Sequence, residues 1–196
     1  MTPKDIDLAQ KLAEAAGEAI RPFFRAKFDQ EAKTDSTFVT EADRAAEAAM
    51  RAIIEAERPD DGIIGEEYGP RNEGASRQWV LDPIDGTTSF IAGRPIFGTL
   101  IALTRNGAPV LGVIDHPALG ERWRGIVGAP SVHWGRGDDG APVQSRPSEG
   151  LDQALACPTS PDVFSRGQAA QFQRVAAAAR ESACGTPRCS QKAVLG

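Results

Sequence analysis

The stretch that decides the fold is Trp79-Val80-Leu81-Asp82-Pro83-Ile84-Asp85-Gly86-Thr87-Thr88-Ser89-Phe90. Its apolar start is typical of a buried strand, and this strand runs into Asp82 and then, a few residues later, into Asp85. Gly86 and the threonines that follow it are typical of a turn at the start of a helix. The stretch therefore predicts a strand, a loop with two acidic side chains, and a helix start.

A second acidic strand end lies upstream of this stretch. The apolar segment Gly62-Ile63-Ile64-Gly65 leads directly into Glu66 and Glu67. Because neighbouring side chains of an extended chain point to opposite sides, we expect only one of these two glutamates to face a shared site. Two acidic strand ends that lie so close in the sequence predict a common acidic site.

Glu66, Asp82 and Asp85 are hard oxygen ligands, which suit Mg²⁺ better than a soft metal. Divalent cations relieve the repulsion between converging carboxylates, and a pair of them can hold a phosphate and activate a water. Gly86 lets the backbone approach an anion, and the N–H groups of Thr87 and Thr88 can face its oxygens. A turn with helix caps and no ligand explains the same residues, so the Asp-x-x-Asp spacing alone leaves both interpretations open.

Two amphipathic helices are predicted before these strands. Thr2-Pro3-Lys4-Asp5 has the residues of a capping box, and apolar residues at helical spacing follow it as far as Pro22. Thr40-Glu41-Ala42-Asp43 has a similar pattern and predicts the start of a second helix, after a short extended piece at 38–40. A capping box explains Thr40 and Asp43, but a carboxylate in the first turn of a helix can also face a site.

An antiparallel meander is predicted after the acidic stretch. Its strands are expected at 95–104, 108–115, 121–127 and 131–134, with a hairpin turn at Asn106-Gly107. After them we expect a turn or domain junction at 135–147, a strand at 151–157 and an alanine-rich helix at 168–180. Helices followed by several strands and a new β–α start predict a layered α+β protein.

The composition is that of a globular chain, with 196 residues, 41% hydrophobic and 25% charged, and a formal net charge of −5. An acidic chain without interleaved basic and aromatic residues disfavours nucleic-acid binding. The sequence has no signal peptide pattern and no run of ~18 apolar residues, so we expect no membrane association and a cytoplasmic protein. We expect unpaired thiols at Cys157, Cys184 and Cys189, and structural or surface roles for His116 and His133.

Asp82-Pro83-Ile84-Asp85-Gly86-Thr87-Thr88 resembles the signature of the inositol monophosphatase family of Mg²⁺-dependent phosphatases. Gly65-Glu66-Glu67 and Val39-Thr40-Glu41-Ala42-Asp43 are similar to its two upstream motifs, in the same order. Further similarity at 89–100, 112–117 and 120–123 is strongest to the bacterial histidinol-phosphate phosphatases. The resemblance implies a layered αβαβα sandwich shared with fructose-1,6-bisphosphatase, a homodimer, and hydrolysis of a small phosphorylated metabolite by a metal-activated water.

Roles for individual residues follow only from this resemblance. It implies that Glu66, Asp82, Asp85 and the carbonyl of Ile84 bind about two or three Mg²⁺ ions. It assigns Glu66, Asp85 and the turn Gly86-Thr87-Thr88 to substrate binding, and Asp43 with Thr87 to orienting the attacking water. Thr88 is a lysine in many histidinol-phosphate enzymes and a threonine in the inositol enzymes, so inositol 1-phosphate is an alternative substrate to histidinol phosphate.

The resemblance also sets the expected domains. A metal- and phosphate-binding α+β domain is expected at 1–142, and the start of an α/β domain at 143–196. The family continues beyond this length and carries another metal-binding aspartate there, whereas the tail after about Arg180 has no apolar periodicity and is unlike the expected continuation. We therefore expect a truncated or frame-shifted chain with an incomplete second domain, and a catalytically inactive remnant is an alternative to an active enzyme.

Overall fold

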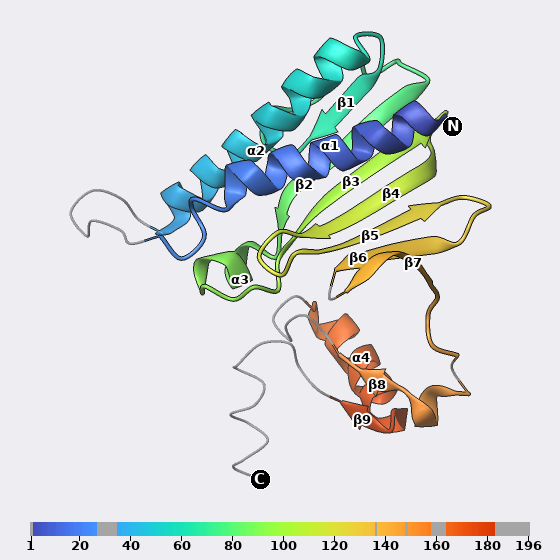
Figure 1. Cartoon of the computed structure of the whole chain (residues 1–196). Helices are drawn as coiled ribbons and strands as arrows, with labels where there is room; N and C mark the ends of the chain where they lie inside the picture. Colours follow the sequence, from blue (N-terminus) through green and yellow to red (C-terminus); the bar gives the residue numbers. More distant parts are fainter. Residues whose placement is uncertain (1, 27–34, 136, 148, 158–163, 183–196) are drawn as a thin grey trace. The chain divides into compact units, whose positions relative to one another are not determined.

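The computed structural model describes residues 2–26, 35–135, 137–147, 149–157 and 164–182. Two compact units, Met1–Gln144 and Ser145–Gly196, make up the chain (Figure 1). Of the helices in the described ranges, none combines the length and the apolar character that are needed to cross a membrane.

The first predicted helix is present with the predicted boundaries. Helix α1 (Pro3–Ile20) opens with the capping box, in which the N–H of Thr2 donates to Asp5 Oδ2 at 2.8 Å. It ends just before Pro22, as the sequence predicts. The cap therefore fixes where this helix starts and the proline limits where it ends.

The second helix starts earlier than the sequence predicts. Helix α2 (Asp35–Glu57) already includes Thr40 and Asp43 in its interior, so the predicted start at Thr40 and the extended piece at 38–40 are both wrong. Asp35, Ser36 and Thr37 also belong to the residue types that begin helices. The apolar spacing gave no reason to prefer one of these starts over the other.

Seven strands form one sheet, and they are β1 (Gly62–Gly65), β2 (Arg77–Asp85), β3 (Gly98–Arg105), β4 (Ala108–His116), β5 (Glu121–Ile126), β6 (Ser131–Gly135) and β7 (Asp138–Val143). β1 pairs with β2 in parallel, and each later neighbour is antiparallel, which confirms the predicted meander. Asn106 and Gly107 have positive φ angles of 51° and 78°, as the predicted hairpin turn requires. The sheet order thus follows the chain order.

Strand β7 lies in the segment 135–147, where the sequence predicts a turn or a domain junction. The boundary between the two units, after Gln144, falls in this segment, but a strand fills much of it instead of a turn. Gly137 and Gly140 adopt positive φ angles that are typical of turns, which explains the error. A side chain on Gly140 would meet Trp134 Nε1 at 3.1 Å, so glycine lets the strand pass close to this ring. Pairing with β6 therefore overrides the local turn preference.

Helices α1 and α2 cover one face of the sheet (Figure 1). α1 packs over β3 and β4, and α2 packs over β2. The buried side chains of this layer alternate along the strands, as Trp79 and Leu81 do in β2. The opposite face carries an apolar groove of about 740 Å³, lined by residues that include Val80, Leu100, Ala102 and Ile114. The helical layer holds β2 in place and thereby constrains the backbone of the acidic residues at the end of this strand.

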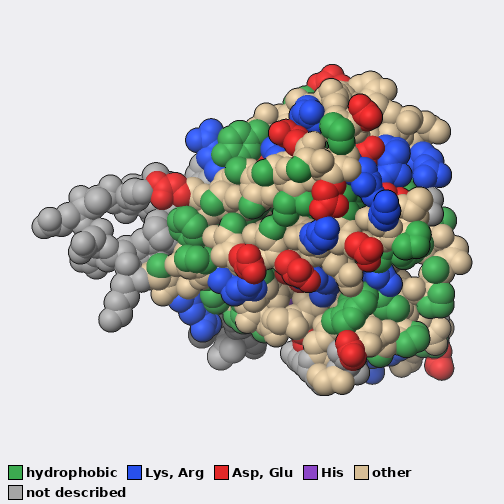
Figure 2. Space-filling view, turned by 45° about the horizontal axis from the view of Figure 1, so that its top comes forward, with side chains coloured by type: hydrophobic (Ala, Val, Ile, Leu, Met, Phe, Trp, Pro, Cys, Tyr) green, Lys and Arg blue, Asp and Glu red, His purple; other side chains and the backbone are tan. Residues whose placement is uncertain are grey.

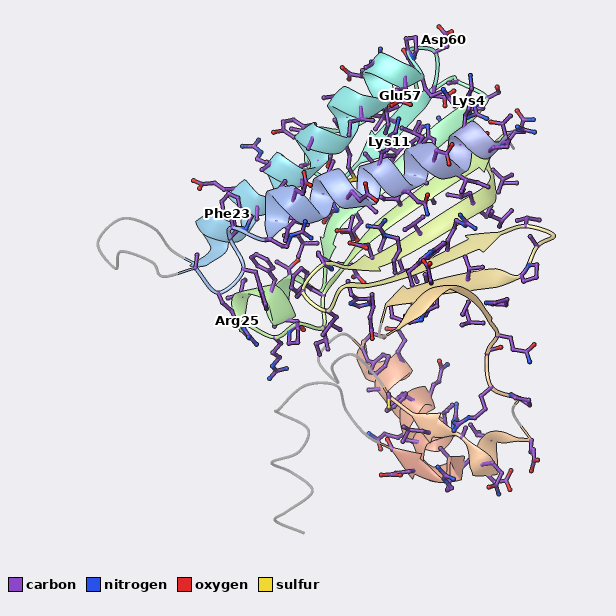
Figure 3. All side chains as sticks on the ribbon, in the orientation of Figure 1. Lys4, Lys11, Phe23, Arg25, Glu57 and Asp60 are labelled. Carbon is purple, nitrogen blue, oxygen red and sulfur yellow. The ribbon has the colours of Figure 1, made fainter. Side chains whose placement is uncertain are left out.

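Charges of both signs are interspersed on the face seen in Figure 2. Lys11 of α1 and Glu57 of α2 lie side by side (Figure 3) and form an exposed ion pair, with Nζ and Oε1 2.8 Å apart. The face seen in Figure 2 therefore carries no extended region of purely positive or purely negative charge.

The described part of the second unit contains two short parallel strands and a helix. β8 (Leu155–Ala156) pairs with β9 (Glu181–Ser182), and α4 (Arg166–Ala178) begins with a capping box formed by Ser165 and Gln168. The predicted helix at 168–180 is confirmed, whereas the strand predicted at 151–157 is a 3-10 turn, η1 (Leu151–Gln153), followed only by β8. Cys157 is a free, exposed thiol, as predicted. Cys184, Cys189 and most of the tail after Arg180 lie outside the described residues.

Candidate metal and phosphate site

The acidic end of β2 is shaped by a break in the strand pairing. Between Asp82 and Asp85 the register of β2 against β3 shifts, and the buried Thr99 hydroxyl donates to the Pro83 carbonyl at 2.8 Å. Gly86 follows with a positive φ of 91°, and a helix begins at the next residue. The predicted order of strand, acidic loop and helix start is confirmed, although β2 reaches Asp85 instead of ending at Asp82.

Helix α3 (Thr87–Ile91) is held against the segment that follows α1. The rings of three phenylalanines pack together with centroids 5.0–5.7 Å apart (Phe24, Phe90 and Phe97). Arg25, which lies beside α3 (Figure 3), donates from Nε to the Gly93 carbonyl at 2.8 Å. These contacts fix the position of the helix that carries the site threonines.

Asp82 is surrounded by other carboxylates. Burial, followed by the charges of Glu66 and Asp85, raises the pKa of Asp82 to about 6. Its buried Oδ1 has no hydrogen-bond partner within the described residues. Because a buried acceptor is destabilising when it stays unpaired, a bound cation would stabilise this oxygen.

Asp43 approaches the same residues from α2. The residue is only 8% exposed, and burial raises its pKa to about 7, with the carboxylates of Glu67, Glu66 and Asp82 adding to the effect. Three separate segments of the chain therefore contribute to one acidic cluster (Asp43, Glu66, Asp82 and Asp85). The chain bends after β1, and the charges of both Glu66 and Glu67 act on Asp43, while the expectation that only one of the two faces the site stays a prediction.

Most of the other predicted site residues are exposed. Thr87 Oγ1 donates to the carbonyl of Ile84, another predicted ligand, at 3.3 Å. Between Asp43 and Thr87, both in the described part of the chain, the structure has no hydrogen bond. Five of the predicted residues are exposed and accessible to a phosphate ester: Glu66, Asp85, Gly86, Thr87 and Thr88.

The donor set of this site fits a hard divalent cation. Carboxylates and a backbone carbonyl are the ligands that Mg²⁺ prefers, and a positive ion at Asp82 Oδ1 would offset the repulsion between the carboxylates. Among the described residues, no group of three or more His, Cys, Asp or Glu side chains is already arranged to hold an ion. Binding a cation here would therefore require the acidic side chains to rearrange around it.

Two residues that shape the site were not singled out from the sequence. Glu47 is fully buried one turn after Asp43, and its carboxylate accepts from the N–H of Glu67 at 2.7 Å. Thr99 holds Pro83 through the hydroxyl described above. The spacing of Glu47 from Asp43 on a predicted helix was a usable signal, whereas the contact of Thr99 depends on strand register.

The two histidines pack on one tryptophan. The ring centroids of His116 and His133 lie 5.5 Å and 4.6 Å from that of Trp123. His133 is buried, and its neighbours are strands of the meander. Both histidines pack within the meander, and a structural role for them stays a prediction.

The sequence profile of the inositol monophosphatase family matches residues 3–191. The chain belongs to this family. The match continues past Arg180, where the resemblance was expected to end, so that expectation is wrong. Solved structures of the family share the layered α+β fold, which confirms the expected fold class.

Three relatives illustrate the similarity. The histidinol-phosphatase of Chlorobaculum parvum is 48% identical over 145 residues, which are 74% of this chain and 54% of that protein. The chloroplastic bifunctional phosphatase IMPL2 of Arabidopsis thaliana is 48% identical over 166 residues, 84% of this chain and 46% of that protein. A solved inositol monophosphatase from Zymomonas mobilis is 46% identical, with a TM-score of 0.81 over 93% of this chain and 68% of that one. The chain spans about half the length of the curated relatives it matches.

Proposed function

We propose that the chain supplies the Mg²⁺- and phosphate-binding part of a phosphate monoester hydrolase that acts on histidinol phosphate. The observation that carries this proposal is the buried, partnerless Oδ1 of Asp82 within the acidic cluster. Family membership supports the class of reaction, and the similarity to the Chlorobaculum histidinol-phosphatase supports the substrate.

In this proposal, Glu66, Asp82, Asp85 and the Ile84 carbonyl hold the cation. When bound, Mg²⁺ supplies positive charge that attracts the phosphate and lowers the pKa of a coordinated water. The hydrogen bond from Thr99 fixes the bulged end of β2, so the backbone that carries the proposed metal ligands of this strand is constrained. Their exposed side admits the ester.

Asp43 and Thr87 are proposed to orient the attacking water. The carboxylate of Asp43 accepts one hydrogen of that water. Thr87 Oγ1 donates its own hydrogen to the Ile84 carbonyl, so its lone pairs can accept the second hydrogen. A water held in this way points its oxygen towards phosphorus, and in-line attack releases the alcohol without a covalent intermediate.

The turn Gly86-Thr87-Thr88 is proposed to bind the phosphate. Gly86 adopts a φ of 91°, and a side chain there would meet the Ile96 carbonyl oxygen at 3.4 Å. Glycine therefore permits the sharp turn that brings the exposed threonines beside Asp85. The Thr88 hydroxyl is available to donate to a phosphate oxygen, whereas that of Thr87 already donates to the Ile84 carbonyl.

Phosphate release from histidinol phosphate and from inositol 1-phosphate, measured at saturating Mg²⁺, tests the proposal. We expect kcat/KM to be at least about ten times higher for histidinol phosphate. A similar preference for inositol 1-phosphate would favour the second candidate substrate, which the 46% identity to the Zymomonas mobilis enzyme supports. Calorimetric Mg²⁺ binding without turnover of either ester would identify a catalytically inactive chain.

A further inference from the structure

The loop after β1 is held by a buried carboxylate on α2. Glu47 is fully buried, and its Oε1 lies 2.7 Å from Nε of Arg51, one turn further along the helix. Glu47 Oε2 accepts from the N–H of Glu67 at 2.7 Å, and Oε1 accepts from the N–H of Tyr68 at 3.3 Å. Two successive backbone N–H groups of the loop therefore donate to the side chain of Glu47.

Arg51 closes this arrangement from the other side. Its Nη2 donates to the carbonyl of Gly69, and its side chain is only 12% exposed. The guanidinium groups of Arg51 and Arg44 lie 5.8 Å and 5.7 Å from the centre of the Tyr68 ring. The loop 67–69 is thus bound to α2 through both its backbone and its aromatic side chain.

Gly65 allows α2 to approach the loop this closely. A side chain at Gly65 would overlap the carboxylate of Glu47. Glu66 lies between Gly65, which packs against Glu47, and Glu67, whose N–H donates to Glu47. The backbone of Glu66 is therefore held on both sides, while its side chain is exposed. The side chain of Glu66 can move, but its point of attachment is fixed.

We propose that Glu47 and Arg51 form a clamp that positions Glu66 for metal binding at a set distance from Asp43. Asp43, Glu47 and Arg51 recur at a spacing of four residues and therefore lie on one face of α2. The clamp ties the loop that carries Glu66 to the helix that carries Asp43. It rests on the proposed function, in which Glu66 is a ligand, and it makes Glu47 a positioning residue.

Glu47→Gln tests the clamp, because it keeps the shape but removes the negative charge that pairs with Arg51. It also replaces one of the two acceptor oxygens with an NH₂ group, which cannot accept a hydrogen bond from the loop or from Arg51. In the metal-free protein, we expect the amides of Glu67 and Tyr68 to exchange with deuterium at least about tenfold faster, as followed by NMR, while amides of β3 and β4 keep their rates. Calorimetry should give a Kd for Mg²⁺ that is about 10–100-fold higher.

Glu57→Gln is the matched control, since it makes the same change on the same helix in an exposed ion pair. It should leave both the exchange rates and the Kd for Mg²⁺ within about twofold of the wild-type values. An unchanged exchange rate or an unchanged Kd in a folded Glu47→Gln protein would overturn the proposal.

Arg51→Lys tests the clamp if the Glu47→Gln protein does not fold. Lysine keeps the positive charge but loses the planar group that reaches both Glu47 and Gly69. Faster exchange at Glu67 and Tyr68 together with weaker Mg²⁺ binding supports the clamp, and wild-type values overturn it. Failure of the wild-type protein to bind Mg²⁺ would instead refute the proposed function, and the exchange rates would still decide whether the clamp holds the loop.

Discussion

Both ends of strand β2 bury carboxylates, but the two ends balance the negative charge in opposite ways. At the start of the strand, Arg77 lies between Asp5 and Asp61, with Nη2 2.8 Å from Asp5 Oδ1 and Nε 3.0 Å from Asp61 Oδ1. The indole N–H of Trp79 adds a hydrogen bond to Asp61 at 3.0 Å. We call Asp5, Asp61 and Arg77 the paired end, in contrast to the acidic cluster at the other end.

The pKa values follow this difference. Burial by itself raises the pKa of Asp5, but hydrogen bonds from Arg77 and Thr2 outweigh it and lower the pKa to about 2. Burial and neighbouring carboxylates together raise the pKa of Asp82 to about 6 and that of Asp43 to about 7. The paired end therefore stabilises the fold, whereas the acidic cluster holds a repulsion that a cation can relieve. This contrast separates acids that are paired with a cation from acids that repel one another more clearly than burial does.

The largest effect is expected when a charge is removed from the acidic cluster. Asp85→Asn keeps the shape of the side chain but removes a ligand charge, so we expect kcat to fall by about a thousandfold or more, or ~4 kcal/mol in the barrier. The free energy of unfolding should stay the same or rise, because repulsion is reduced. Steady-state phosphate release and urea unfolding check this, with the exposed Asp60→Asn as control (Figure 3). Near-normal turnover at saturating Mg²⁺ would contradict the metal assignment.

Removing the positive charge of Arg77 from the paired end should lower the stability of the fold. Arg77→Gln leaves Asp5 and Asp61, which are 1% and 6% exposed, without their shared partner. We expect the free energy of unfolding at pH 7 to fall by about 3 kcal/mol, at the low end for buried pairs because Arg77 is partly exposed. Urea unfolding measures the loss, and the Kd for Mg²⁺ of the folded variant should be unchanged. A loss below about 1 kcal/mol would show that the arginine is not what balances these carboxylates.

The free energy of unfolding, measured as a function of pH, should show opposite contributions from the two ends of β2. Asp43 and Asp82 have native pKa values of about 7 and about 6, above their ordinary value of 3.8, so the metal-free native state binds extra protons. Its stability should therefore fall as pH rises from about 4 through about 7. Asp5 acts in the opposite direction, since its contribution is present above pH 3.8 and is lost as pH falls through about 2.

The expected size of this decline is about 2 kcal/mol between pH 5 and pH 8, after allowance for screening by solvent. Urea unfolding with a chelator measures it. Saturating Mg²⁺ should remove the decline, because a bound cation favours the charged carboxylates. A stability that is constant over this range without metal would mean that the acidic cluster carries no repulsion.

Much of the framework was predictable because its signals are local. The capping residues at Thr2 and Asp5 and the turn at Asn106-Gly107 act within a few residues, and both were identified from the sequence. Strand β7 was missed because it forms by pairing with β6 in a segment whose glycines favour turns. Local patterns therefore predict elements well when the deciding contacts are also local.

The site was only partly predictable for the same reason. The ligand residues at the strand ends were identified from their positions and from the family motifs, but their charge balance depends on distant partners. Arg77 and Asp5 are 72 residues apart in the sequence, and no local pattern pairs them. The charges of both Glu66 and Glu67 act on Asp43, which lies on a helix more than 20 residues earlier in the sequence. Which acids are paired and which repel each other is decided by the tertiary fold.

The smallest effect is expected for an ion pair that lies outside both ends of β2. Lys11 Nζ and Glu57 Oε1 are 2.8 Å apart, the same distance that separates Arg77 from Asp5, but their side chains are 55% and 37% exposed. Water screens this pair, so Lys11→Gln should change the free energy of unfolding by less than about 0.5 kcal/mol. A double-mutant cycle with Glu57→Gln, measured by urea unfolding at low and high salt, isolates the interaction. A coupling above about 1 kcal/mol would contradict the argument that burial, rather than distance, gives the paired end its strength.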